Sequence, residues 1–236
     1  MEVLPVTGMG EVRPGDVLGD LLAEALGGPG GPGLAEGDVV VVTQKVVSKA
    51  EGRLVALDPV DPDAHHRRIV AQESVRVLRR RGDLVISETA HGFVCASAGV
   101  DRSNVEDGWV ALLPVDPDRS ARRLADRLRA RLGVSAGVVV SDTFGRPWRR
   151  GVVDVAIGVA GVAAVVDLRG TPDGTGRPLA VTEVAVADEL AAAAELVMGK
   201  AAGVAAAVVR GVDRAWLRPG SVAAEVVRPP AEDLFR

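Results

Sequence analysis

The sequence predicts a mixed α/β fold, and three observations support this class. Short apolar segments with the length of buried strands, such as Val39–Val42 and Val138–Val140, alternate with segments of helical spacing. Turn residues separate these segments at short intervals. Hydrophobic residues make up 47% of the 236 residues, which is enough for a substantial core. We therefore expect one module over residues 1–236, built as one domain or as two intertwined ones.

The first part of the chain is expected to start with a short extended segment and a helix over Asp16–Leu26. Gly27–Gly33 then acts as a connector, because its two prolines lack a backbone donor and no Gly-Lys-Ser/Thr follows. Asp38–Thr43 is predicted as a buried strand, followed by the polar segment Gln44–Arg53. An amphipathic, arginine-rich helix is predicted over Asp63–Arg81.

The rest of the chain continues the alternation of strands and helices. A helix is expected to begin at Asp116–Pro117–Asp118 and to end at Leu132, and another is predicted over Ala187–Met198. The remaining strand predictions are Leu84–Ser87, Phe93–Ala98, Val110–Leu113, Ala136–Val140, Val162–Leu168, Val181–Ala185 and Val204–Val209.

Composition and charge exclude several classes of function. The formal net charge is -4 and the basic residues are spread along predicted helices, so no nucleic-acid partner is expected. No uninterrupted apolar run is long enough to span a bilayer, and the N-terminus lacks the pattern of a secretory signal. The cytoplasm is the expected location. Cys95 is the only cysteine, which excludes a zinc site built from several thiolates, so any bound metal is expected to use oxygen ligands.

Two residue types are rare in a way that directs attention to particular positions. Only Lys45, Lys49 and Lys200 are lysines among 28 basic residues, and Asn104 is the only asparagine. Arginine cannot replace lysine everywhere, because the two cations differ in geometry and hydration. The four residues are therefore candidates for a chemical role, with survival at tolerant surface positions as the alternative.

Polar residues follow or flank predicted strands at two of these places. The segment after Thr43 carries Lys45 and Lys49 at the carboxyl end of a strand, where α/β proteins commonly bind ligands. Further along, Asp101 could bind a hard cation through oxygen, and Asn104 could hydrogen-bond a base, ribose or phosphate. Each segment can equally be an ordinary solvated loop or turn.

The segment Ser141–Gly151 is the most informative one. Asp142 and Thr143 place a carboxylate and a hydroxyl side by side at the end of a predicted strand, which suits magnesium or manganese. Three arginines follow that suit bidentate contacts with phosphate or carboxylate: Arg146, Arg149 and Arg150. An arginine-rich surface turn would explain the basic residues but not the neighbouring Asp-Thr pair.

A fourth candidate, Met198–Gly203, ends a predicted helix in small residues. Its glycines permit close approach of the backbone to a ligand and Lys200 adds charge, although helix C-termini favour both residue types on their own. Together the four segments supply two carboxylates for a divalent metal and several cations for phosphate. No Walker A loop, Rossmann fingerprint or kinase signature is present, so the combination indicates nucleotide handling by a less common fold.

The motifs of this chain also resemble those of a known family. The strings Val47–Arg53, Ala98–Glu106 and Ser141–Arg146, followed by Arg149–Gly151, are similar to the coenzyme F-420:L-glutamate ligase family, also called F-420-0 gamma-glutamyl ligase. The resemblance runs from Leu4 to Gly211, nearly the whole chain. All three lysines and the asparagine fall within the motif segments.

The resemblance implies a GTP-dependent ligase that attaches L-glutamate to the lactyl-phosphate tail of a deazaflavin, the coenzyme F-420 precursor, and then adds further γ-linked glutamates. The substrate carboxylate would take the γ-phosphoryl group of GTP, and the amine of glutamate would attack the resulting acyl phosphate. Magnesium or manganese at two sites, potassium as an activator and a homodimer with active sites near the interface are expected. No fused nitroreductase-like domain is expected.

The resemblance also implies roles for individual residues. Asp101 and Asp142 would hold the first metal, and Thr143 would contact the second. Asp142, Arg149 and Arg150 are the predicted catalytic residues. As a hypothesis beyond the resemblance, Arg146, Arg149 and Arg150 anchor the acidic substrate or the acyl phosphate. The implied GTP contacts are Gly8, Met9, Gly10, Glu11, Gln44, Lys45, Lys49, Asn104, Met198, Gly199, Lys200, Ala201, Ala202, Gly203, Val204 and Ala205.

The chain departs from the family pattern at two places. Family members carry an acidic metal ligand where this chain has Lys200, so a main-chain carbonyl or water would have to complete the second metal site. Gly8–Glu11 also differs from the usual apolar version, which backbone contacts tolerate. Two other functions stay open: a carboxylate-amine ligase with another acidic acceptor, and a nucleotide sensor that binds GTP without turning it over.

Overall fold

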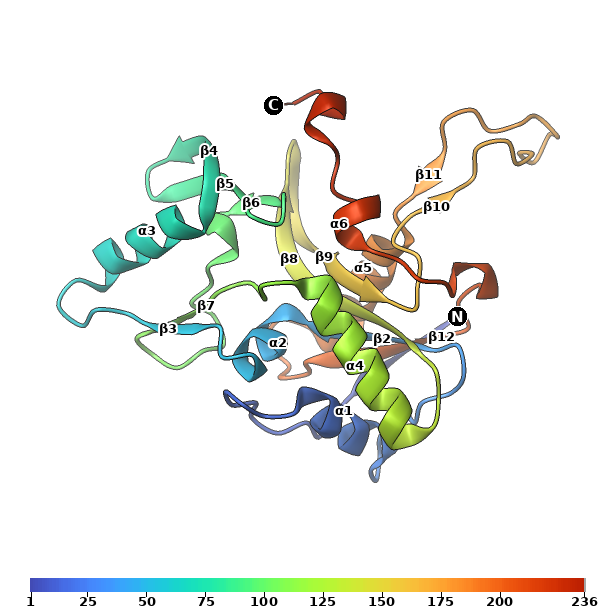
Figure 1. Ribbon diagram of the computed structural model, residues 1–236, viewed down its shortest axis with the longest axis horizontal. Coiled ribbons are helices and arrows are strands. Elements are labelled where there is room, and N and C mark those ends of the chain that lie inside the picture. The colour runs from blue at the N-terminus through green and yellow to red at the C-terminus, as the bar shows by residue number, and fades with distance from the viewer. Residues whose placement is uncertain (236) are drawn as a thin grey trace.

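The computed structural model describes residues 1–235 and confirms the mixed α/β class (Figure 1). Its centre is a five-stranded sheet in which β2 and β8 are parallel neighbours and all other pairs are antiparallel. In spatial order the strands are β1 (Glu2–Val6), β12 (Ala206–Arg210), β2 (Val39–Thr43), β8 (Gly137–Arg146) and β9 (Arg149–Ala160).

Helices cover both faces of this sheet. The four valines of β2 are 0% exposed, which requires protein on each side because successive side chains of a strand point to opposite faces. α1 (Leu18–Gly27) and α4 (Pro117–Leu132) pack together on one face, and α5 (Val186–Met198) lies behind the sheet (Figure 1). The two longer helices confirm the predictions that end at Leu132 and Met198.

The start of α4 is fixed tightly against β9. Asp116 caps the helix by accepting a hydrogen bond from the Arg119 N–H at 2.9 Å. The buried carboxylate of Asp118 accepts hydrogen bonds from the backbone of Val159, Val222 and Ala223 and from Ser221 Oγ. α6 (Val222–Glu225) is thereby tied to the same corner.

A smaller lobe is inserted between β2 and α4. Its own hydrophobic cluster consists of Ile69, Val70, Val85, Val100, Val110 and Leu112. α2 (Gln44–Ala50) leads into the lobe but packs its buried Val47 in the main core. The elements of the lobe are β3 (Leu54–Ala56), α3 (Pro62–Glu73), β4 (Ser74–Arg81), β5 (Leu84–Thr89), β6 (Val94–Ala96), the 3-10 helix η1 (Ser97–Gly99) and β7 (Trp109–Ala111). β4–β6 form a three-stranded sheet, and β3 pairs with β7.

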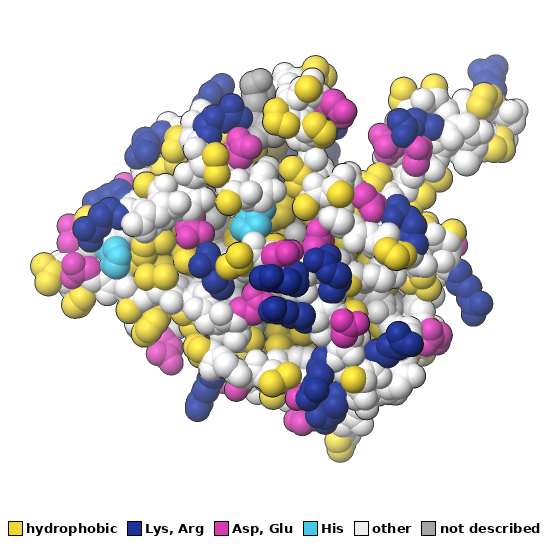
Figure 2. Space-filling view, viewed as in Figure 1, with side chains coloured by type: hydrophobic (Ala, Val, Ile, Leu, Met, Phe, Trp, Pro, Cys, Tyr) yellow, Lys and Arg dark blue, Asp and Glu magenta, His cyan; other side chains and the backbone are white. Residues whose placement is uncertain are grey.

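An arm projects from the body between β9 and α5 (Figure 1). Its base is the two-stranded pair β10 (Val166–Asp167) and β11 (Glu183–Val184). Figure 2 shows that the arm carries both acidic and basic side chains and stands clear of the main surface. Two further 3-10 helices, η2 (Arg214–Trp216) and η3 (Pro230–Glu232), lie near the C-terminal end. Within residues 1–235 no helix has the length and hydropathy needed to cross a membrane.

The predicted helix over Asp63–Arg81 is wrong in its second half. The helix ends at Glu73, and Ser74–Arg81 is strand β4. The run Val75–Leu78 alternates apolar and basic residues at the start, a pattern that a strand also satisfies, and β5 provides the pairing partner. The local sequence pattern is compatible with both a helix and a strand, and pairing with β5 makes this segment a strand.

The region around the predicted strand end at Ser141–Thr143 also differs from expectation. β8 does not end there but continues to Arg146, and a two-residue turn at Pro147–Trp148 leads into β9. Strand β9 was not predicted, whereas the strand expected over Val162–Leu168 is limited to Val166–Asp167. Trp148 adopts the positive φ of this turn, 59°, at a position where hairpins usually have glycine or asparagine. The sequence therefore lacks the usual marker of a hairpin.

Candidate active site

One cavity of about 910 Å³ gathers most of the residues that the sequence singled out. Six separate segments line it: the loop after β1, α2 with the residue before it, the segment after η1, the middle of β8, the facing part of β9, and the end of α5 with the loop that leads to β12. These segments are far apart in the chain. The cavity therefore exists only because the sheet brings their ends together.

The strand order explains this convergence. β2 and β8 are parallel, and Thr43 is paired with Ser141, so polar residues that follow the two buried strands emerge at the same edge. β12 runs antiparallel to β2, and the Thr43 N–H donates to the Ala205 carbonyl at 2.9 Å. The carboxyl ends of buried strands are thus joined at this edge by the loop that precedes β12.

Most of the predicted contact residues line this cavity. Among the GTP-contact predictions these are Met9, Gly10, Glu11, Gln44, Lys45, Lys49, Asn104, Gly199, Lys200, Ala201, Gly203, Val204 and Ala205, and the predicted metal ligands Asp101, Asp142 and Thr143 also line it. The lining does not include Gly8, Met198, Ala202, Arg149 or Arg150.

The two predicted catalytic arginines lie on the hairpin formed by β8 and β9. Arg149 and Arg150 are exposed and stand at the start of β9, beside the turn at Pro147–Trp148. The third arginine, Arg146, donates to the Arg150 carbonyl at 3.4 Å. Within one chain the structure thus places these arginines apart from the cavity carboxylates, and their role stays a prediction.

Lys45 connects α2 to the segment that carries Asp101. Its ammonium donates to the Asp101 carboxylate and, at 2.7 Å, to Ser103 Oγ. The Ser103 N–H donates to Asp101 Oδ1 at 2.7 Å. Desolvation alone would raise the pKa of Asp101, but the hydrogen bonds from Lys45 and Ser103 hold it below its usual value. Asp101 therefore stays ionised at neutral pH.

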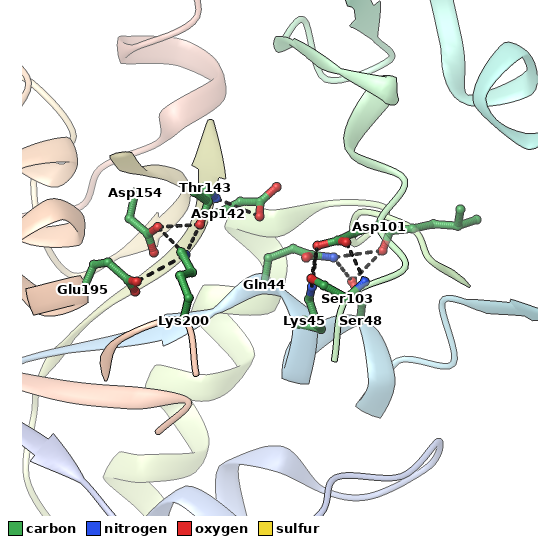
Figure 3. Close-up of polar contacts among 11 residues, drawn as sticks. Gln44, Lys45, Ser48, Asp101, Ser103, Asp142, Thr143, Asp154, Glu195 and Lys200 are labelled. Carbon is green, nitrogen blue, oxygen red and sulfur yellow. Dashed lines mark hydrogen bonds and ion pairs between the residues drawn. The ribbon is translucent and has the colours of Figure 1, made fainter. Parts of the chain in front are cut away.

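Asp142 lies between two groups of polar side chains, as Figure 3 shows. Within residues 1–235 its carboxylate accepts one hydrogen bond, from the Thr143 N–H at 2.8 Å. Desolvation raises the pKa of Asp142 to about 7, the Thr143 N–H and Lys45 act in the opposite direction, and Asp101 and Asp154 raise it. A cation bound next to Asp142 would stabilise its ionised form.

Gln44 and Ser48 hold α2 in place rather than pointing freely into the cavity. The buried Gln44 amide donates to Ser48 Oγ at 2.6 Å and to the Leu112 carbonyl at 3.0 Å. Ser48 Oγ donates to the same carbonyl at 2.6 Å. This network orients the helix from which Lys45 and Lys49 extend.

All three lysines of the chain line this one cavity, and each contacts a carboxylate. Lys45 pairs with Asp101, and Lys49 donates to Glu11 Oε1 at 2.5 Å. Lys200 pairs with Asp154 and Glu195. The concentration of lysine at one place favours a chemical role over survival at tolerant surface positions.

Sequence reasoning missed two acidic residues of the cavity, Asp154 on β9 and Glu195 on α5. Asp154 is buried and accepts hydrogen bonds from Ser141 Oγ at 3.1 Å and from Thr143 Oγ1 at 2.6 Å. Its one visible signal was a charge inside the apolar run that begins at Val152. Glu195 gave no signal, because an exposed helix face carries glutamate routinely.

Lys200 lies among these acidic side chains. Its ammonium contacts Thr143 Oγ1, Asp154 Oδ1 at 2.8 Å and Glu195 Oε1 at 3.4 Å (Figure 3). Desolvation would lower the pKa of Lys200, but Asp154 and Glu195 raise it above its usual value. The group is thus a permanent cation at neutral pH.

Negative charge predominates in the lining. Three ammonium groups, those of the three lysines, face six carboxylates: Glu11, Asp101, Glu106, Asp142, Asp154 and Glu195. Such a cavity repels a polyanion unless cations enter with it. It accordingly suits a ligand that arrives as a complex with divalent metal.

The donor set fits one divalent ion at Asp101 and Asp142. Lys45 contacts Asp101 Oδ2, but Asp142 Oδ2 accepts no hydrogen bond within residues 1–235, so this pair keeps a carboxylate oxygen for a cation. Carboxylate oxygens are the ligands that magnesium and manganese prefer, and both side chains line the same cavity. No group of three or more His, Cys, Asp or Glu side chains arranged for metal binding occurs within residues 1–235. Water and ligand oxygens would therefore complete the coordination, as is usual for magnesium.

Comparison with known proteins places the chain in a family. A family model described as F420-0:Gamma-glutamyl ligase matches residues 8–211. The chain belongs to this family. It is 44% identical to a protein of Methanopyrus kandleri named coenzyme F420:L-glutamate ligase, with 100% of this chain and 98% of that protein covered. Proteins of the same name from Methanothermobacter thermautotrophicus and Archaeoglobus fulgidus are 42% and 39% identical, again over 100% of this chain and over 99% and 96% of theirs.

Proposed function

We propose that this chain is a ligase that uses GTP to join L-glutamate to the lactyl-phosphate tail of the coenzyme F-420 precursor, and then to add further glutamates through γ-linkages. Similarity to the named ligases over nearly their whole length supports the reaction class. The observation that carries the proposal is the single cavity in which Asp101, Asp142 and all three lysines meet.

The reaction we propose has two steps. In the first, an oxygen of the acceptor carboxylate forms a bond to the γ-phosphorus of GTP, the bond between that phosphorus and the β,γ-bridging oxygen breaks, and GDP leaves. In the second, the amine of glutamate attacks the acyl carbon, the bond to the phosphate oxygen breaks, and the amine loses a proton. Phosphate leaves far more readily than oxide, which is why the carboxylate is activated first.

The lysines of the cavity are suited to contacting phosphate oxygens. Lys45 and Lys49 extend from α2 as point charges, and Gln44 holds that helix through the buried Leu112 carbonyl. Asn104 lines the cavity with a φ of 54° and can hydrogen-bond a base, a ribose or a phosphate. These side chains position the nucleotide for transfer rather than react with it.

Asp101 and Asp142 would hold the divalent ion of the nucleotide complex. When bound, magnesium or manganese supplies neutralisation of phosphate charge and alignment of the γ-phosphoryl group. Potassium activation and a homodimer are predictions that follow from the family resemblance, and the cytoplasmic location is a prediction from the sequence.

Mass spectrometry of the deazaflavin product tests the proposed reaction directly. The protein is incubated with the deazaflavin precursor, GTP, L-glutamate and manganese, and GDP is measured in parallel. We expect mass increases of whole glutamyl units with GDP formed in step. ATP in place of GTP, and other amines or acidic acceptors in place of glutamate and the precursor, provide the matched comparisons.

The outcomes separate the alternatives. GDP release with a different acceptor, but not with the deazaflavin, would indicate a ligase of other specificity. Binding of GTP without any GDP formation, in the presence of both co-substrates, would indicate a nucleotide sensor. Either result would contradict the proposed activity.

A further inference from the structure

The ammonium of Lys200 occupies a position that is built like a cation site. The Lys200 side chain extends from the loop after α5 toward three oxygen atoms. They belong to Thr143 on β8, Asp154 on β9 and Glu195 on α5 (Figure 3). The Asp154 side chain is only 1% exposed, whereas that of Lys200 is 52% exposed. The Lys200 ammonium therefore lies between the buried Asp154 carboxylate and the open cavity.

The hydrogen bonds around Lys200 are mutually consistent. Thr143 Oγ1 donates its proton to Asp154 Oδ1 at 2.6 Å, so its lone pairs are available to accept from the ammonium. Asp154 Oδ1 accepts from Lys200 as well, and Asp154 Oδ2 accepts from Ser141 Oγ. The three N–H groups of the ammonium match three oxygens: Thr143 Oγ1, Asp154 Oδ1 and Glu195 Oε1.

This arrangement does not fit a second divalent ion at Thr143. The hydroxyl that would contact such an ion already accepts a hydrogen bond from Lys200 and donates one to Asp154. A divalent ion placed there would lie next to a fixed positive charge and would gain no ligand from the lysine, since an ammonium has no lone pair. The expected second metal site is thus filled by a side chain.

We propose that the Lys200 ammonium takes the place of a second divalent cation, so that the chain binds its nucleotide with one divalent ion, at Asp101 and Asp142. This inference rests on the proposed nucleotide and metal binding. Lys200 acts as a positioning residue: it neutralises Asp154 and Glu195 and presents positive charge to the cavity that would receive the triphosphate. No step of bond making or breaking is assigned to it.

Counting bound manganese ions tests this directly. Native mass spectrometry of the intact chain, with manganese and a non-hydrolysable GTP analogue, gives the number of ions per nucleotide-bound protein. We expect one ion for the wild type and for Lys200→Arg, which keeps the charge. We expect two for Lys200→Gln, which frees the oxygens, and for Lys200→Glu, which adds a ligand.

The second ion should bind Lys200→Glu at least about 10-fold more tightly than it binds the wild type, a change of the size that altered metal surroundings produce. Arg177→Met is the matched control, because it removes an exposed positive charge outside the cavity lining and should leave the count at one. Circular dichroism of each variant shows whether it is folded. Lys200→Gln carries the test if Lys200→Glu does not fold.

Two results would overturn the inference. One is two manganese ions on the wild-type chain at the same nucleotide occupancy. The other is a count that stays at one in folded, nucleotide-bound Lys200→Gln and Lys200→Glu. Failure of the proposed function has a different signature: the wild type would then bind neither the analogue nor manganese, and the inference would fall with it.

Discussion

Asp142 stands where the two groups of cavity side chains meet, with Lys45 and Asp101 on one side and Asp154 on the other. Replacing it with asparagine keeps the shape but removes the charge that would hold the divalent ion. We expect Asp142→Asn to lower kcat by about two orders of magnitude or more, because alignment of the phosphoryl group fails. Initial rates of GDP release give the measurement.

A matched control for Asp142→Asn is Asp126→Asn on the exposed side of α4, which removes the same charge far from the lining residues. This variant should retain wild-type rates. Equal rates for Asp142→Asn and the wild type would mean that the first metal site has been assigned to the wrong residue.

Cys95 illustrates a residue whose surroundings make it inert. Burial raises the pKa of its thiol to about 12, and the charge of Asp142 acts in the same direction. Since the folded-state pKa lies well above neutrality, the reactive thiolate is nearly absent at pH 8. We expect no labelling by iodoacetamide at pH 8 in the folded protein and one label per chain in denaturant, measured by intact mass. Rapid labelling of the native protein would contradict the buried position.

Site residues that belong to a recognisable sequence motif could be predicted from the sequence. Site residues that reach the cavity only through strand pairing could not. Asp101, Asp142 and the three lysines stood out by type and spacing, and the structure brings them to one cavity. The contribution of Asp154 depends on register. It faces Thr143 across the β8–β9 pair, and nothing local to the sequence specifies that partner.

At the scale of elements, the contact between β9 and α4 tolerates no added atom. A Cβ at Gly158 would lie 2.3 Å from the carbonyl carbon of Pro117 and 2.7 Å from the Asp118 nitrogen. We expect Gly158→Ala to destabilise the fold by about 1 to 3 kcal/mol, the range for overpacking. Urea denaturation followed by circular dichroism measures the change.

The control for Gly158→Ala is Gly174→Ala on the projecting arm, where a Cβ would meet no atom within 4 Å. Its free energy of unfolding should equal that of the wild type within error. A Gly158→Ala protein of unchanged stability would show that α4 can shift away from β9.

The hairpin of β8 and β9 carries Arg149 and Arg150 outside the cavity lining. If these arginines anchor the acidic acceptor, Arg149→Ala and Arg150→Ala should raise KM for the deazaflavin and leave the affinity for the GTP analogue unchanged. Steady-state kinetics with each substrate varied in turn separates the two effects. Normal KM and kcat in both variants would remove the arginines from the mechanism.

Element boundaries could be predicted where local chemistry specifies them. Asp116 and Pro117 start α4 as capping rules require, and Gly133 ends it with a φ of 69°. The segment Ser74–Arg81 had no such marker. Its conversion from predicted helix to strand depends on β5, which follows after a turn at Gly82.

At the scale of the whole molecule, ligand binding should stabilise the fold, because the cavity joins the central sheet to the smaller lobe. With a GTP analogue and manganese at about 100 times Kd, the gain is about 2.7 kcal/mol. For a chain of this size that raises Tm by about 5 to 10 °C. Differential scanning fluorimetry with and without EDTA provides the measurement, and an unchanged Tm would contradict binding at this site.

The order of strands in the central sheet was beyond prediction from the sequence. The class follows from alternating patterns, but β12 is inserted between β1 and β2 and the smaller lobe is inserted before β8. Both features depend on contacts between residues that are distant along the chain. The cavity depends on the same long-range contacts, because the six segments that line it come together only when the sheet is complete.

The pairing of β1 with β12, from Glu2–Arg210 to Val6–Ala206, also bears on how the protein is made. A ribosome adds about 5 to 20 residues per second, so β1 emerges tens of seconds before its partner strand exists. During that interval β1 has no strand to pair with. Chaperone protection of the growing polypeptide should therefore matter most until the last strand has been translated.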